Sequence, residues 1–168
     1  GLVVVNSGEQ AKVDGGGAPR KTAVLEATNI IQWCLYYPGG LDLKELGYSR
    51  QANRSIAADN EGDLLAALAA YGHRTHSGAN ADKVYHAGLL LAVGRVDKAQ
   101  RLLNAASPGT PGRQALQTLI AAVTLQPRPD SNPPQTASDW IAVSYYLQSQ
   151  ANLPAALDAA PRAASIRP

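Results

Sequence analysis

The three histidines are the first residues to test for chemistry, because imidazole nitrogens bind metals and transfer protons near neutral pH. His73 and His76 lie in a stretch rich in glycine and serine, and His86 follows within an apolar run beside Tyr85. No Asp, Glu or Cys stands at ligand spacing beside His73 and His76, so the pattern of a zinc site is missing. We therefore expect no bound metal, and we expect His86 to pack inside a helix with its ring nitrogen satisfied.

A glycine-rich stretch and a single cysteine are the other candidates. Residues 15–22 have the sequence GGGAPRKT, but Arg20 occupies the place where a phosphate-binding loop requires its second glycine. Cys34 has no catalytic context in the sequence, and the alternation puts it on the face opposite Trp33 and Leu35; we expect a buried structural thiol. One cysteine allows neither an internal disulfide nor a cysteine-based zinc site. Paired carboxylates, a nucleophile elbow and a dinucleotide fingerprint are also missing, so we expect a non-enzymatic protein without a cofactor.

Composition favours closely packed helices and excludes some partners. The 168 residues are 45% hydrophobic yet include no Phe and no Met, so Ala, Leu, Val and Ile must form the core. The net charge is +2, and the ten arginines among the 15 basic residues are scattered along the chain. A nucleic-acid surface would need clustered basic residues, so we expect no nucleic-acid partner. No apolar run approaches the roughly 20 residues of a membrane span, and the first residues lack the pattern of a signal peptide.

The last 29 residues, 140–168, predict two helices of similar length joined by a tight turn. Apolar residues recur at three- and four-residue steps on both sides of Asn152, which is placed to cap the second helix. Pro154 falls in the first turn of that helix, where its missing N–H costs nothing, and Pro168 ends it. Small residues, among them Ser144 and Ala156, allow the two helices to approach closely.

This stretch resembles a tetratricopeptide repeat, a helix–turn–helix unit of about 34 residues. Trp140, Ala156 and Pro168 match the family pattern, while Val143-Ser144, Leu147 and Ala160 take the places of Leu-Gly, Tyr and the aromatic residue. The spacing agrees at every point. An antiparallel helix pair in another all-helical domain would share the pattern.

Two earlier helix pairs follow the same scheme. Helices are predicted over 49–60 and from Asp63 to about residue 74, and then over 81–93 and 95–106, with Gly94 as the turn. Ala67 and Ala99 take the alanine position of the repeat and lie 32 residues apart. These spacings predict a repeat array and not a set of unrelated helices.

The step from Ala99 to Ala156 is irregular, at 57 residues. It contains one clear helix, 113–125, followed by QPRPDSNPPQTAS, whose four prolines exclude a helix. The array is therefore expected to hold two repeats, one incomplete repeat whose second helix is replaced by a proline-rich loop, and a final repeat. Two alternatives stay open: one short helical turn inside that loop, or an array that is divided into two sub-blocks.

The first 45 residues differ from the rest and predict a β-rich segment, with the helical domain over 46–168. Residues 2–5 form a β-branched run, and a strand is preferred to a helix over 24–37, which stays the rival interpretation. Gly8-Glu9-Gln10-Ala11, Gly16-Gly17 and residues 33–38 resemble the closing segment of FecR-type domains of bacterial envelope proteins. That resemblance implies an extracytoplasmic setting, in the periplasm or at the cell surface.

The expected fold is mostly α: a solenoid of about three to four helix pairs resembling tetratricopeptide repeats, with a short N-terminal β segment. Such a stack presents the first helix of each pair to a partner, so we expect a non-enzymatic scaffold that binds another protein or a peptide. Helical phase alone places six candidate contact residues on that face: Asn53, Lys83, His86, Gln117, Tyr145 and Gln148. The alternative function is a structural subunit that assembles into an oligomer or filament through its N-terminal strands.

Overall fold

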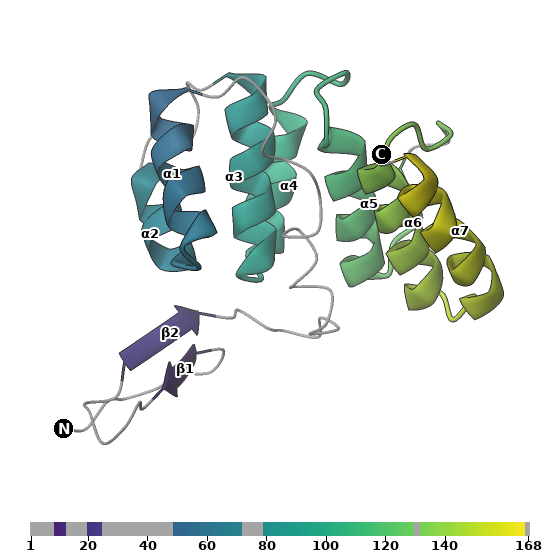
Figure 1. Cartoon of the computed structure of the whole chain (residues 1–168), viewed down its shortest axis with the longest axis horizontal. Helices are drawn as coiled ribbons and strands as arrows, with labels where there is room; N and C mark the ends of the chain where they lie inside the picture. The colour runs from purple at the N-terminus through teal and green to yellow at the C-terminus, as the bar shows by residue number, and fades with distance from the viewer. Residues whose placement is uncertain (1–8, 13–19, 25–48, 72–78, 130–131, 167–168) are drawn as a thin grey trace.

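A computed structural model describes residues 9–12, 20–24, 49–71, 79–129 and 132–166, and most of these residues are helical. The mostly α class is therefore confirmed, and Figure 1 shows the helices standing side by side along the molecule. The helices are α1 (Arg50–Asn60), α2 (Leu64–Tyr71), α3 (Asn80–Ala92), α4 (Val96–Asn104), α5 (Arg113–Thr124), α6 (Ala137–Ser149) and α7 (Leu153–Ile166). None of them is long and apolar enough to cross a bilayer.

Two short strands precede the helices. Strands β1 (Glu9–Lys12) and β2 (Arg20–Val24) pair antiparallel, with Glu9 opposite Val24 and an irregularity between Gln10 and Ala11. The strand predicted over 2–5, nearly all of 24–37, Cys34, the glycines of 15–17 and the boundary at residue 45 lie outside the described residues. The extent of the β segment and its role in assembly stay predictions.

Two of the three helix pairs share one packing contact, and the third has small buried residues at the same spacing. α1 packs on α2, α3 on α4, and α6 on α7. The Ser55 hydroxyl donates to the Ala67 carbonyl at 2.7 Å, and the Ser144 hydroxyl donates to the Ala156 carbonyl at 2.9 Å; both bonds span 12 residues and are buried. Ala87 and Ala99 take the same two positions in α3 and α4 and are also buried. Small side chains at these positions let the helix axes approach closely enough for a direct bond to the backbone.

Local signals end the helices near the predicted residues. The Asp63 carboxylate accepts the N–H of Ala66 at 2.8 Å, which confirms its capping role at the start of α2. Gly94 turns the chain between α3 and α4 with φ of 77°, in the left-handed region that glycine adopts without strain. Before α6, Thr136 and Asp139 form a reciprocal capping box.

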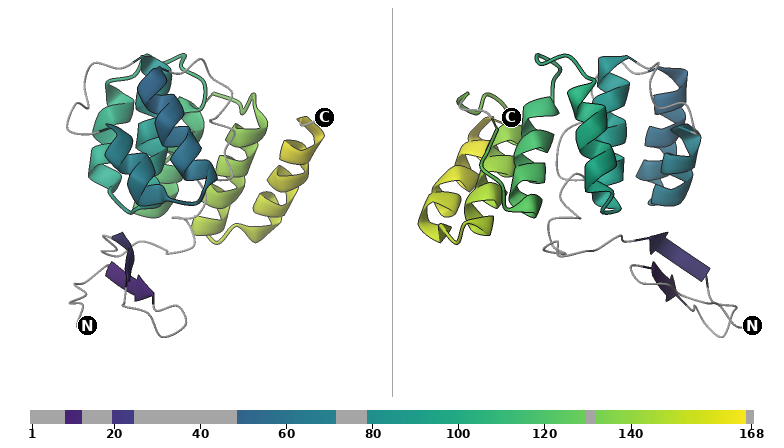
Figure 2. Two further views of the ribbon diagram at one scale, coloured as in Figure 1. Left: turned by 60° about the vertical axis from the view of Figure 1, so that its left-hand side comes forward. Right: turned by 180° about the vertical axis from the view of Figure 1, so that it is seen from behind.

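The connection from α5 to α6 is extended and returns along the two helices. The Arg128 N–H donates to the Tyr146 hydroxyl in the last turns of α6, and the Gln114 amide in the first turn of α5 donates to the Asn132 carbonyl. The chain therefore runs from one end of the helices back to the other, and α6 starts in the same direction as α5 (Figure 2). Residues 125–129 and 132–136, which are the described part of this connection, contain no helix. The described part of this connection agrees with the proline-rich loop predicted here, and the assignment of the helices to repeats stays a prediction.

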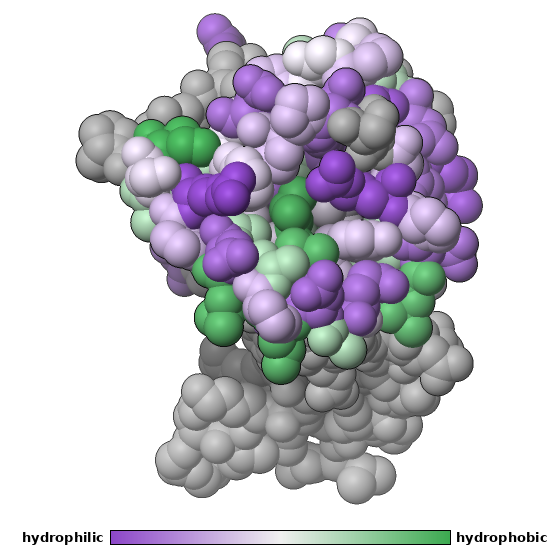
Figure 3. Space-filling view, turned by 90° about the vertical axis from the view of Figure 1, so that its right-hand side faces the viewer, coloured by the Kyte–Doolittle hydropathy of each residue, from purple (hydrophilic) through white to green (hydrophobic). Residues whose placement is uncertain are grey.

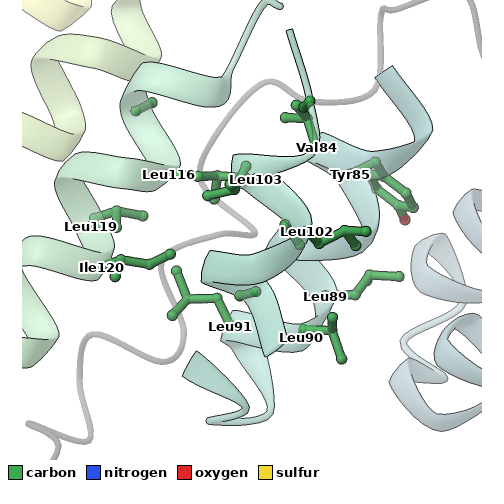
Figure 4. Packing of buried hydrophobic residues seen from close by; sticks show 14 of the residues in the cluster. Val84, Tyr85, Leu89, Leu90, Leu91, Leu102, Leu103, Leu116, Leu119 and Ile120 are labelled. Atoms are coloured by element: carbon green, nitrogen blue, oxygen red, sulfur yellow. The ribbon is translucent and has the colours of Figure 1, made fainter. Parts of the chain in front are cut away.

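Leucine and alanine form the interior, as the missing Phe and Met require. The largest fully buried side chains include Leu91 on α3, Leu103 on α4, and Leu116 and Leu119 on α5. Figure 4 shows these four leucines in the space that α3, α4 and α5 share. This cluster ties the α3–α4 pair to α5, which follows it in the chain.

Candidate functional site

The six predicted contact residues all lie on the helices that come first in each pair, or on α5, which has no second helix. We call α1, α3, α5 and α6 the first helices, and α2, α4 and α7 the second helices. The structure gives these residues different exposures, because the first helices also contact their neighbours. Asn53 on α1 is exposed, Lys83, Gln117, Tyr145 and Gln148 are half-buried, and His86 is buried.

Lys83 is held at the end of the neighbouring helix. Its ammonium donates to the Ala105 carbonyl at 3.0 Å and to the Asn80 amide oxygen at 3.5 Å. Ala105 directly follows the last residue of α4, where carbonyls lack helical partners and carry partial negative charge. The cation therefore stabilises the α3–α4 pair, and a partner that used it would first have to displace the carbonyl.

His86 lies in an aromatic cluster between the first two pairs. Its ring is 6% exposed and stacks on Tyr71 of α2, with the ring centroids 4.2 Å apart and the planes 6° from parallel. Tyr85 adjoins the same Tyr71 ring, and the Tyr85 hydroxyl donates to the Asp59 carboxylate on α1 at 3.0 Å. Burial lowers the pKa of His86 from 6.5 to about 4, so the imidazole is neutral at pH 7. This is the environment of a packing histidine.

The amide side chains on the later first helices are better placed for contact. Gln117 accepts a long bond of 3.4 Å from the Arg113 guanidinium, and Arg113 also donates to the Leu103 carbonyl at 3.0 Å. Gln148 donates to the Ser144 hydroxyl at 3.4 Å. Weak bonds of this length leave amide groups that can exchange partners at little cost. Tyr145 packs its half-buried ring against the core beside them.

The metal-site and catalytic predictions fall partly on residues that the structure does not describe. In the ranges from residue 49 onward, no group of three or more His, Cys, Asp or Glu side chains could hold an ion. His73, His76, Cys34 and most of the glycine-rich stretch of 15–22 lie outside the described residues, so their predicted roles are not tested.

Two features were not foreseen from the sequence. The Arg162 guanidinium of α7 lies over the Trp140 ring of α6, 4.9 Å from its centroid, which adds a cation–π contact to the last pair. The second feature is that α7 exposes Leu153 and Leu157, although their spacing is typical of a buried face. The cation–π contact could be sought in a sequence as an Arg and a Trp on the two helices of a predicted pair. No local sequence signal indicates that the leucines of α7 are exposed.

Comparison of the chain with protein-family models, with curated proteins and with solved structures found no match. The functional argument therefore depends on the helices themselves and on the side chains they present.

Proposed function

We propose that this chain is a scaffold of tetratricopeptide-like repeats that binds a peptide segment of another protein along its first helices. One observation carries the proposal: two helix pairs share the same buried contact between small residues, and the third pair has buried small residues at the same 12-residue spacing. It joins Ser55 to Ala67 and Ser144 to Ala156 through hydrogen bonds, and it places Ala87 and Ala99 at equivalent positions. Repeated pairs cannot bury both faces alone, and stacking them leaves a continuous surface along the first helices.

The chemistry of this surface predicts how it would bind. Asn53, Gln117 and Gln148 offer uncharged amides, each of which can both donate and accept hydrogen bonds. Lys83 is bonded to the end of α4, and His86 is neutral and covered by Tyr71. The surface is therefore suited to the main chain of an extended segment and not to a terminal carboxylate. Binding should change little with salt, since few charges would be paired.

The proline-rich return between α5 and α6 strengthens this interpretation. Without a second helix in the third unit, α6 packs directly on α5. Gln117 on α5 and Gln148 on α6 then lie on two adjacent first helices that run in the same direction. Gln117 lies near the start of α5 and Gln148 near the end of α6, so we expect a bound segment to run obliquely across the two helices and contact both amides.

Selection of peptides from a displayed random library, followed by affinity measurement, tests the proposal. The test variant carries Gln117→Ala and Gln148→Ala, and the matched control carries Gln100→Ala on α4, where the Gln100 amide bonds only to nearby Asn104 in the described contacts. We expect selected peptides to lose at least about tenfold in affinity for the double variant, or 1.4 kcal/mol, and to keep their affinity for the control. Failure to enrich any peptide, or peptides that bind all three proteins equally, would contradict the proposal.

A further inference from the structure

The α1–α2 pair meets the α3–α4 pair through a stack of two buried rings. His86 of α3 lies parallel to Tyr71 of α2, with the ring centroids 4.2 Å apart. His86 is 6% exposed and Tyr71 is 5% exposed, so water reaches little of either side chain. The contact between the two pairs therefore contains a buried group that a proton can charge.

Two carboxylates hold the same pairs together on either side of this stack. The Tyr85 hydroxyl of α3 donates to the Asp59 carboxylate of α1 at 3.0 Å. The Ser49 N–H, directly before α1, donates to the buried Asp82 carboxylate in the first turn of α3 at 3.1 Å. We call this contact of α1 and α2 with α3 the first junction, and it consists of Ser49, Asp59, Tyr71, Asp82, Tyr85 and His86.

The contact of α3 and α4 with α5 is built from different side chains, and we call it the second junction. It consists of the buried leucines Leu91, Leu103, Leu116 and Leu119 (Figure 4) and of Arg113, whose guanidinium donates to the Leu103 carbonyl. An arginine keeps its charge at any pH at which the protein folds. We therefore expect the second junction to be insensitive to acid.

The helices beyond the second junction serve as an internal reference. The chain has three histidines, and none of them follows His86. Figure 3 looks onto the end of the molecule formed by α6 and α7, where apolar side chains reach the surface among polar ones. We expect the packing at this end to be the same in mild acid as at neutral pH.

Protonation of His86 conflicts with the closed first junction. The burial that lowers its pKa to about 4 leaves an imidazolium poorly hydrated against the Tyr71 ring. Asp82, one turn earlier on α3, is a carboxylate that could compensate the charge. Because Asp82 already accepts the Ser49 N–H, an imidazolium turned toward it would leave the stack and compete with that bond.

The other charged groups on the helices around His86 offer no compensation among the described residues. On α3, Lys83 is bonded to the end of α4, and α2 contains no Asp, Glu, Lys or Arg. The charged side chains of α1 and α4, apart from Asp59 of the first junction, are all exposed: Arg50, Arg54, Asp97, Lys98 and Arg101.

We propose that the first junction opens in mild acid, when a proton on His86 releases the α1–α2 pair from α3 while α3 to α7 stay packed. The released helices have 11 and 8 residues, and helices this short are marginal alone, so their backbone hydrogen bonds should open as well. Opening would also remove Asn53 from the surface of the first helices. That consequence rests on the proposed function, whereas the opening itself does not.

The size of the effect follows from the proton linkage. The imidazole titrates at the ordinary pKa of 6.5 in the open state and at about 4 in the closed junction. The ratio of open to closed molecules should therefore rise about 30-fold between about pH 7.5 and about pH 5. Ordinary carboxylates keep their charge over this range, so the range isolates histidine from Asp and Glu.

Hydrogen exchange of the full chain at these two pH values, read by mass spectrometry and corrected for the intrinsic exchange rates, tests the proposal. In the wild type, protection of α1 and α2 should fall about 30-fold relative to protection of α5 and α6. His86→Phe keeps a flat ring on Tyr71 without a titrating group, and its relative protection should stay constant within about twofold. The matched control, His73→Gln with His76→Gln, removes the other two histidines and should respond like the wild type.

A second uncharged variant covers the case in which the phenyl ring disturbs the first junction. His86→Gln should protect α1 and α2 less at both pH values, yet its relative protection should also be independent of pH. Equal loss of protection in all helices, no loss in the wild type, or a loss that persists in both uncharged variants would overturn the proposal. A response that disappears in the His73 and His76 control would overturn it as well.

Discussion

The two halves of the helical region reverse the chain in different ways. In α1–α4 each first helix is followed by a second helix, which returns the chain and buries apolar residues such as Leu103. Between α5 and α6 the return is an extended, proline-rich segment held by side-chain bonds from Gln114 and to Tyr146. The helices therefore still stack where a second helix is missing, because α6 packs directly on α5. In the return segment the stabilising contacts are hydrogen bonds, whereas a second helix contributes buried apolar side chains. Substitutions should therefore cost most in the first half and least in the return segment.

The largest difference is expected between a buried leucine of α4 and an exposed leucine of α7. Leu103→Ala removes a fully buried side chain and should lower the free energy of unfolding by about 2–5 kcal/mol. Leu157→Ala removes a largely exposed side chain and should change it by about 0.5 kcal/mol or less in the monomer. Urea denaturation at low micromolar concentration measures both. Similar losses for the two variants would remove the distinction between a covered and an uncovered second helix.

The second prediction concerns how the free energy of unfolding depends on pH through His86, which lies where the α1–α2 pair contacts the α3–α4 pair. Burial lowers the pKa of His86 to about 4, below its ordinary 6.5, so folding favours the neutral ring. The stabilisation is complete above pH 6.5 and is lost as the pH falls toward 4, by about 3 kcal/mol for a shift of this size.

A variant without the titrating group isolates this effect. His86→Phe keeps a flat ring for stacking on Tyr71 but cannot be protonated. The difference in unfolding free energy between the wild type and His86→Phe should fall between pH 6.5 and 4, while carboxylate effects cancel. A constant difference over that range would mean that His86 is hydrated in solution.

The third prediction tests whether the three pairs share one contact. Ser55→Ala and Ser144→Ala each remove a buried hydrogen bond and should cost about 0.5–1.5 kcal/mol of stability. Ala87→Ser places the same hydroxyl opposite the Ala99 carbonyl and should be tolerated within about 0.5 kcal/mol. Thermal denaturation of the three variants measures the effects. A severe loss on Ala87→Ser would show that the middle pair is packed differently.

The smallest effect is expected in the return segment. Tyr146→Phe removes the hydroxyl that accepts the Arg128 N–H and should cost about 1 kcal/mol or less, because the group is only partly buried. Hydrogen exchange at the Arg128 amide should accelerate, while exchange in α3 and α4 stays unchanged. Slow exchange at Arg128 in the variant would show that the extended segment is held by other contacts.

Much of the helical architecture follows from local signals. The Asp63 cap, the Gly94 turn, the helix beginning at residue 113 and the proline-rich interruption all depend on residues near one another in the chain, so the sequence predicts them. The boundary at the end of α5 is one residue earlier than expected, because Leu125 adopts φ of 54° and ends the helix.

The candidate site was less predictable, since helical phase does not reveal which neighbour covers a face. Phase places His86 and Asn53 on the same side of their helices, yet Tyr71 covers His86 while Asn53 stays exposed. Lys83 appeared free for a partner, but its bond to Ala105 depends on how α4 ends. The leucines of α7 have the spacing of a buried face, yet Leu153 and Leu157 are exposed in the structure.

The measurement that tests the account most directly is thiol labelling at equivalent positions of α4 and α7. Leu103→Cys and Ala160→Cys are reacted separately with a maleimide at low micromolar concentration, and the labelled peptide is identified by mass spectrometry. We expect Ala160→Cys to react at nearly the rate of an unfolded thiol, and Leu103→Cys to react only as fast as the protein opens. Equal protection at the two positions would mean that Ala160 is covered like Leu103, and would contradict the difference in burial between α4 and α7.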